Sequence, residues 1–189
     1  MTRLRSFVLG AMILASPLGA QEKPRYQIGV LADRYTPESN AILGRLQEEI
    51  RAVVGEDAHL EFLPELRLFN DFDLNQARAN YEQLASGEAD LVMAFGYVSS
   101  LMLRERQAFP LPTILFGATN LEIAQFDTES QPSGIPNFTY LIDVQSYAED
   151  LAALRELTQF GNLGIAIEAK IAETLPVREA FQRILNGQN

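Results

Sequence analysis

Cysteine is absent from this 189-residue sequence and histidine occurs once, and both scarcities remove classes of chemistry. Without cysteine, neither a disulfide nor a thioether-linked lipid anchor can form. The single histidine, His59, lies in a run expected to be a strand and has no plausible second metal ligand nearby, so the sequence favours a structural role for it. We expect no metal site and no cofactor.

Several sequence signatures of catalysis and nucleotide binding are also missing. No G-x-G-x-x-G follows the first expected strand, no phosphate-binding G-x-x-x-x-G-K-[ST] occurs, and no G-x-S-x-G hydrolase elbow is present. A receiver domain would need an acidic cluster after strand one and an Asp ending strand three, but the third expected strand ends at Phe95 and Gly96. Asp71 and Asp73 resemble part of a calcium loop whose further ligands fail in spacing, so we expect them to cap a helix.

Positive charge is scarce. The chain has 15 basic and 25 acidic residues and a formal charge of −10. Such a surface repels phosphate backbones and anionic membranes, so the charge argues against nucleic acid as a partner. Plain solubility explains the acidity equally well, and the charge therefore identifies no partner.

The first twenty residues have the layout of a secretory signal. Arg3 and Arg5 precede an apolar run over 7–15, and small residues follow up to Ala20. A buried N-terminal strand or helix is the weaker alternative, because two arginines precede the run and no acid occurs before Glu22. We expect a signal peptide over 1–20, export to the periplasm, and a product that is not membrane-embedded after cleavage.

The remainder predicts a repeating order of strand and helix. Near-continuous apolar runs predict strands at 26–31, 90–95 and 113–116, and an alternating pattern predicts another at 57–63. Between them we expect a helix from a Thr36 cap to Gly55 with an apolar stripe through Ala41, Ile42, Leu46, Ile50 and Val53 or Val54, a second from Asp73 to Gly87, and a third over 98–107. Apolar strands alternating with amphipathic helices are typical of an α/β fold with a doubly wound, flavodoxin-like parallel sheet.

The pattern breaks between 118 and 136, which reads as a connection. Beyond it we expect a strand over 137–142, a helix over 143–160 that turns Tyr147, Leu151, Leu154 and Leu157 inward, a strand over 162–169 and a last helix over 175–185. We therefore divide the chain into a first α/β lobe over 21–134 and a crossover with a partial second α/β lobe over 135–189.

Polar residues follow three of the expected strands, at the edge where parallel sheets bind ligands. The candidate ligand-binding residues are Asp33, Arg34, Tyr35 and Thr36; Gly96, Tyr97, Val98 and Ser99; and Ala118, Thr119 and Asn120. Ser99 or Ser100 would open a helix whose N-terminus favours an anionic group such as a carboxylate. For any one loop, chain turning and helix capping explain the residues equally well; Asp33 and Arg34 could simply form a surface ion pair.

Four stretches carry a resemblance: "GEADLVMAFGYVSS", "LPTILFGATN", "GIPNFTYLIDVQSYAEDLAALREL" and "NLGIAIEA". They resemble the exported substrate-binding proteins of ABC transporters with a type I periplasmic-binding fold, and more narrowly a subgroup for aromatic amino acids or related small solutes. Asn120-Leu121 stands where the family has Asp-Pro, and Tyr140 where it has Gly, so the ligand need not be the usual one.

The resemblance implies a function without catalysis. A small polar or aromatic ligand would be held between two lobes, with Glu168 at the start of the opposite wall, and delivered to an inner-membrane ABC permease. The second lobe would be short for this family. An exported sensory or protein-interaction module with the same fold is the alternative, and an enzyme ranks below both.

Overall fold

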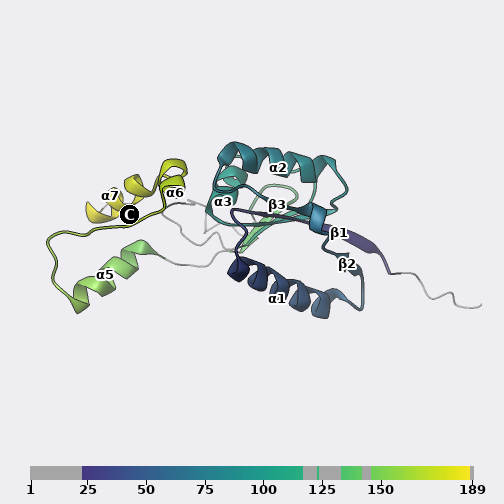
Figure 1. The fold of residues 1–189 in the computed structure, drawn as a ribbon, viewed down its shortest axis with the longest axis horizontal. Coiled ribbons are helices and arrows are strands. Elements are labelled where there is room, and N and C mark those ends of the chain that lie inside the picture. Colours follow the sequence, from purple (N-terminus) through teal and green to yellow (C-terminus); the bar gives the residue numbers. More distant parts are fainter. Residues whose placement is uncertain (1–22, 117–122, 124–132, 142–145, 188–189) are drawn as a thin grey trace, which may run out of the picture.

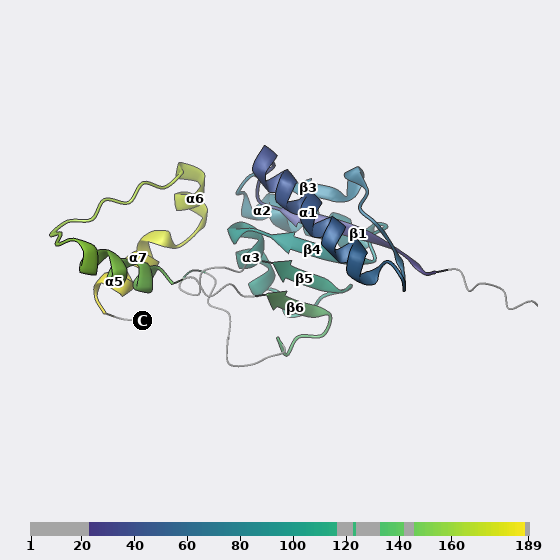
Figure 2. The same cartoon turned by 90° about the horizontal axis from the view of Figure 1, so that it is seen from below.

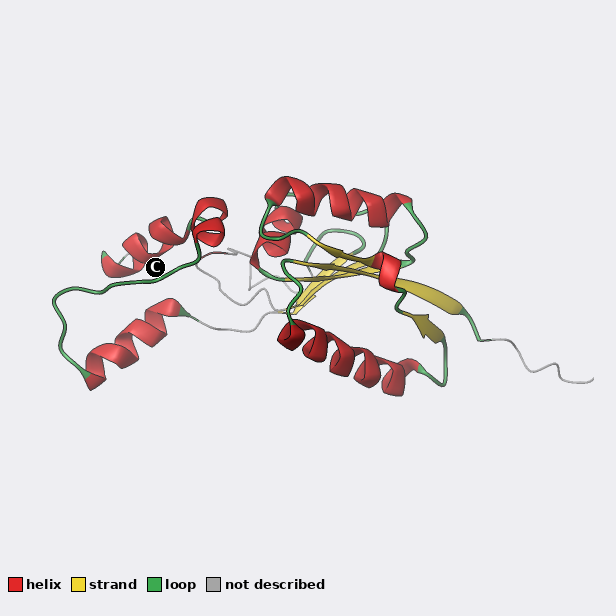
Figure 3. Cartoon of the chain, in the orientation of Figure 1, coloured by secondary structure: helices red, strands yellow, loops and turns green. Residues whose placement is uncertain are grey.

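The computed structural model describes residues 23–116, 123, 133–141 and 146–187. Its centre is a six-stranded sheet in the order β2-β1-β4-β5-β6, with β3 also paired to β1, and the pairings among these strands are all parallel. Helices cover both faces of the sheet, as Figures 1 and 3 show. The predicted α/β fold with a doubly wound, flavodoxin-like sheet is confirmed.

The first strand and the first helix form where the sequence predicts them. Strand β1 spans Arg25–Ala32, and helix α1 spans Pro37–Val54. Thr36 caps α1 in a capping box with Ser39, and Gly55 ends the helix. The predicted apolar stripe of α1 is partly wrong, however, since Leu43 and Gln47 are the buried residues and the side chain of Ile42 is 67% exposed.

The second predicted strand, over 57–63, is wrong as a single element. A short β2, His59–Glu61, pairs with the start of β1; a turn of 3₁₀ helix, Pro64–Leu66, follows; and β3, Arg67–Phe69, pairs with the end of β1. Pro64 lacks the N–H that would continue the hydrogen bonds to β1, so the chain leaves the sheet at Pro64 and pairs with β1 again in β3. This step brings residues 70–73 to the carboxyl edge of the sheet.

The middle of the chain follows the predictions closely. Helix α2 spans Leu74–Ser86 with Asp73 as its cap, β4 spans Leu91–Phe95, α3 spans Tyr97–Arg104 and β5 spans Thr113–Phe116. Helices α2 and α3 pack on one face of the sheet over a core that includes Tyr81, Leu103 and Leu115. A smaller core that includes Leu43, Phe62 and Met93 lies under α1 on the other face.

Strand β6, Phe138–Leu141, is the far edge of the sheet and pairs with β5. It therefore belongs to the first lobe's sheet and is not a strand of a second one. Beyond it lie three helices: α5 over Tyr147–Leu157, α6 over Ala169–Thr174 and α7 over Val177–Leu185. In Figure 2 the arrowheads of β4, β5 and β6 point toward these helices.

The C-terminal part differs most from the predictions. The strand expected over 162–169 does not form; residues 162–168 are irregular and helix α6 begins at Ala169. The expected last helix, over 175–185, is confirmed as α7, and α6 before it is a helix that was not predicted. On α5, Leu151 is buried as expected, but Leu157 is 84% exposed and Leu154 is also exposed. A strand needs a neighbour for its backbone, and no described strand lies next to 162–168.

Candidate functional site

The carboxylate of Asp33 joins the ends of three strands. Asp33 directly follows β1 and is buried, and it accepts hydrogen bonds from the backbone N–H of Val98 at 2.9 Å and of Ser99 at 3.0 Å. The Ser99 hydroxyl and the Asn70 side-chain amide also donate to it, at 2.9 and 3.1 Å. The loops after β1, β3 and β4 are thereby fixed to one another.

Gly96 is required for this approach. Its φ of +101° is one that side chains rarely adopt, and a Cβ added there would lie 2.4 Å from the Asp33 carboxylate. Gly96 was predicted to contact a ligand; in the structure the group that approaches its backbone is the internal side chain of Asp33.

The predicted anion contact at the start of α3 is taken by an internal group. The N-terminus of α3 does not offer its N–H groups to an external anion, because Asp33 already accepts from them. Val98 and Ser99, also predicted as ligand-binding residues, are fully buried. Asp33 and Arg34 do not form the surface ion pair considered above, since the Asp33 carboxylate faces the α3 N-terminus.

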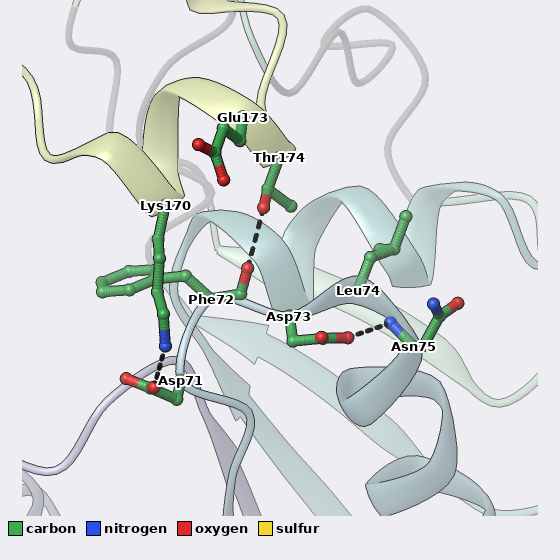
Figure 4. A pocket seen from close by; sticks show the side chains of 8 residues that line it. All are labelled: Asp71, Phe72, Asp73, Leu74, Asn75, Lys170, Glu173 and Thr174. Atoms are coloured by element: carbon green, nitrogen blue, oxygen red, sulfur yellow. Dashed lines mark hydrogen bonds and ion pairs between the residues drawn. The ribbon is translucent and has the colours of Figure 1, made fainter.

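Arg34 instead pairs with the C-terminal part of the chain. Its guanidinium donates to both oxygens of Glu168, at 2.6 and 2.9 Å, and to Asp71 at 3.2 Å. Lys170 completes the cluster by binding the other oxygen of Asp71 (Figure 4). We call these four side chains the ion cluster. Sequence analysis placed Arg34 and Glu168 on opposite walls of one site, and here they are in direct contact.

The charges of the ion cluster stabilise one another. The hydrogen bond from Lys170 is the largest effect that holds the pKa of Asp71 below its ordinary value; desolvation opposes it, and the hydrogen bond from Arg34 adds to it. The hydrogen bond to Glu168 raises the pKa of Arg34. All four side chains are at least one-third exposed, so the cluster acts as a surface network and not as a buried pair.

Sequence analysis missed Asn70 and misassigned Asp71, because β3 was not recognised. Asn70 is almost fully buried, donates to Asp33 and Ser99, and accepts from the backbone N–H of Phe72. Asp71 and Phe72 both have positive φ, which bulky residues rarely adopt. Asp71 was expected to cap a helix; only Asp73 does so. The apolar triplet 67–69 after Pro64 was the available signal.

Figure 4 shows the hollow beside this loop, a cavity of about 420 Å³ between α2 and α6. Carboxylates dominate it, but Asp73 is engaged in capping α2 and Asp71 in the ion cluster. Thr174 closes one side by donating to the carbonyl of Phe72 at 2.9 Å. Among the described residues, no group of three or more His, Cys, Asp or Glu could hold a metal ion.

A second cavity, of about 330 Å³, lies between the start of α3 and the C-terminal part. We call it the apolar cavity. Its walls include Tyr97, Tyr147, Phe181, Ile165, Ile167 and Glu168. The rings of Tyr147 and Phe181 stack with centroids 4.9 Å apart. Tyr97 and Glu168, predicted from separate parts of the chain, thus line one cavity.

The other predicted site residues that the structure describes do not line this cavity. Tyr35 is exposed and packs edge-on against Phe69 with ring centroids 5.5 Å apart, and the Thr36 hydroxyl caps α1. Ala118, Thr119 and Asn120 lie outside the described residues. The described helices include none that is both long and apolar enough to cross a membrane.

Comparisons of the chain with protein-family models, with curated proteins and with solved structures found no match. The resemblance to ABC substrate-binding proteins therefore stays a prediction from the sequence. Independently of that resemblance, the structure has an apolar cavity at the carboxyl edge of a doubly wound sheet.

Proposed function

We propose that this chain is an exported solute-binding protein that holds a small molecule and delivers it to an inner-membrane ABC permease. It carries out no catalysis. The signal-like residues 1–20 support export, and the four stretches that resemble ABC substrate-binding proteins support the transport role.

The apolar cavity is the observation that carries the proposal. Open parallel sheets bind ligands outside the carboxyl ends of their strands, and Tyr97 directly follows the end of β4. The cavity volume of about 330 Å³ lies at the small end of ordinary ligand sites. Its opposite wall comes from the C-terminal part, so a bound ligand contacts both parts of the chain.

One feature supports the alternative, an exported sensory or protein-interaction module. A cavity of about 350 Å³ opens beside α1 on the other face of the sheet, with apolar walls that include Ile28, Ile50, Phe62, Met93, Ile114 and Phe116. An apolar surface of this kind fits a protein partner as well as a solute.

Isothermal titration of the full chain against pools of small solutes tests the proposal. We expect at least one pool to release or absorb heat with a one-to-one stoichiometry, and a truncation in the apolar cavity, Phe181→Ala, to abolish that signal. Silence across all pools, together with a genomic neighbourhood that lacks a permease and an ATPase, would favour the interaction module.

A further inference from the structure

We infer that the apolar cavity takes an uncharged ring compound of one or two fused rings, and that it discriminates against anions and zwitterions. The inference rests on the proposed binding function and names the ligand class of that same site.

The walls of the cavity supply ring faces and aliphatic side chains. Tyr97, Tyr147 and Phe181 contribute the rings, and the stacked pair Tyr147 and Phe181 offers a flat wall. Ile165 and Ile167 are 44% and 39% exposed although they lie at this cavity, so water covers apolar surface there. A flat apolar ligand would displace that water, which is favourable in proportion to the area covered.

The charges near the cavity are already matched. Glu168 is the single charged residue among the described residues that line it, and both of its oxygens accept from Arg34. The α3 N-terminus next to Tyr97 is filled by the Asp33 carboxylate. A charged group on the ligand would therefore lose its hydration without gaining an unpaired charged side chain among the described lining residues, which is costly in an apolar site.

Three related probes test this class: indole, which is neutral; indole-3-acetate, an anion; and tryptophan, a zwitterion. The chain contains no tryptophan, so the fluorescence of each indole ring, excited at wavelengths beyond the tyrosine absorption band, can be followed without background from the protein. We expect indole to bind the full chain, and the two charged probes to bind at least about tenfold more weakly.

Variants place the binding in one cavity. Ile165→Ala and Ile167→Ala remove apolar contact from exposed positions and should each weaken indole binding about three- to tenfold. Phe116→Ala is the matched control, because Phe116 lines the other apolar cavity, beside α1. We expect it to leave indole binding unchanged.

A fourth variant tests the charge argument. Glu168→Gln removes one of the two carboxylates that hold Arg34, so it should strengthen indole-3-acetate binding about threefold or more.

The outcomes separate this inference from the proposed function. Tighter binding of tryptophan or indole-3-acetate by the unmodified chain, lost in Ile165→Ala, overturns the ligand class and leaves solute binding intact. Loss of indole binding in Phe116→Ala but not in Ile165→Ala or Ile167→Ala overturns the choice of cavity. Failure of all three probes overturns the inference, and the solute pools then decide the proposed function separately.

Discussion

The Asp33 carboxylate accepts from Val98 N, Ser99 N, Ser99 Oγ and Asn70 Nδ2 while its side chain is only 6% exposed. Each of these donors is buried, and a buried donor that loses its acceptor costs free energy. Asp33 therefore has a structural role at the residue scale: it fixes the position of α3, and with it Tyr97 at the wall of the apolar cavity.

Asp33→Asn keeps the shape of this side chain but replaces one acceptor oxygen with a donor. The amide would face the N–H groups of α3, so we expect the free energy of unfolding to fall by about 2–3 kcal/mol. Urea unfolding followed by circular dichroism measures it. Asp57→Asn, an exposed acid in the turn after α1, is the control and should change stability by less than about 0.5 kcal/mol.

Gly96 and Gly44 form a second matched pair at this scale. Gly96→Ala would place a Cβ at positive φ and against the Asp33 carboxylate, so we expect a loss of about 1–3 kcal/mol. Gly44 lies within α1 with no heavy atom within 4 Å of an added Cβ, so Gly44→Ala should gain about 0.5–1 kcal/mol. Thermal unfolding of both variants checks the sign of each stability change. A Gly96→Ala variant as stable as the unmodified chain would contradict the tight contact with Asp33.

At the scale of elements, the C-terminal helices attach to the rest of the chain in two ways. Leu175, Val177 and Ala180 are buried in the main core, and the ion cluster and the Thr174 hydrogen bond tie α6 to the loop after β3. The apolar contacts hold α7, while α6 contributes no fully buried residue. The position of α6 therefore depends more on the charges.

Asp71→Asn should loosen α6. The carboxylate form of Asp71 makes the bonds to Lys170 and Arg34, so its stabilising effect is full above the ordinary pKa of about 3.9 and disappears as pH falls through its lowered pKa in the folded chain. The variant reproduces that loss at neutral pH. We expect amide hydrogen exchange within Ala169–Thr174 to accelerate, with exchange in α2 unchanged.

Salt provides the control for this prediction. Because the ion cluster is exposed, raising the ionic strength should accelerate exchange in α6 of the unmodified chain and have little effect on Asp71→Asn. Equal salt sensitivity in both chains would mean that the cluster does not hold the helix.

Local signals explain which elements could be predicted. Helices α1 and α2 have caps and an end signal within their own sequence, Thr36 and Gly55 for the first and Asp73 and Gly87 for the second. The strand expected over 162–169 failed because its apolar, β-branched residues indicate a strand only if a neighbouring strand accepts its hydrogen bonds. That neighbour depends on tertiary structure.

At the scale of the whole molecule, the two faces of the sheet are covered unequally. Among the described helices, α2 and α3 cover one face and α1 covers the other (Figure 1). The cavity beside α1 has Ile114 and Phe116 in its wall. Neighbouring residues of β5 therefore have different environments: Leu115 is fully buried and Ile114 is half-buried.

Two variants, Leu115→Thr and Ile114→Thr, test this asymmetry. Threonine favours strands, so both variants keep the strand propensity of β5 and differ in the burial of the replaced side chain. We expect Leu115→Thr to cost about 2–4 kcal/mol, because it buries a hydroxyl and leaves a void, and Ile114→Thr to cost no more than about 1 kcal/mol. Urea unfolding compares the two. Equal losses would mean that a further segment covers the α1 face.

The sequence by itself determined the alternation of strands and helices, the parallel sheet and most helix ends, because periodicity and capping act between residues close in the chain. It also placed Tyr97 and Glu168 among the site residues. Tertiary structure decided that Asp33 fills the N-terminus of α3 and that Arg34 pairs with Glu168, 134 positions away. It also decided that the cavity between Tyr97 and the C-terminal part is apolar. Those outcomes depend on which distant groups meet, and spacing along the chain does not encode that.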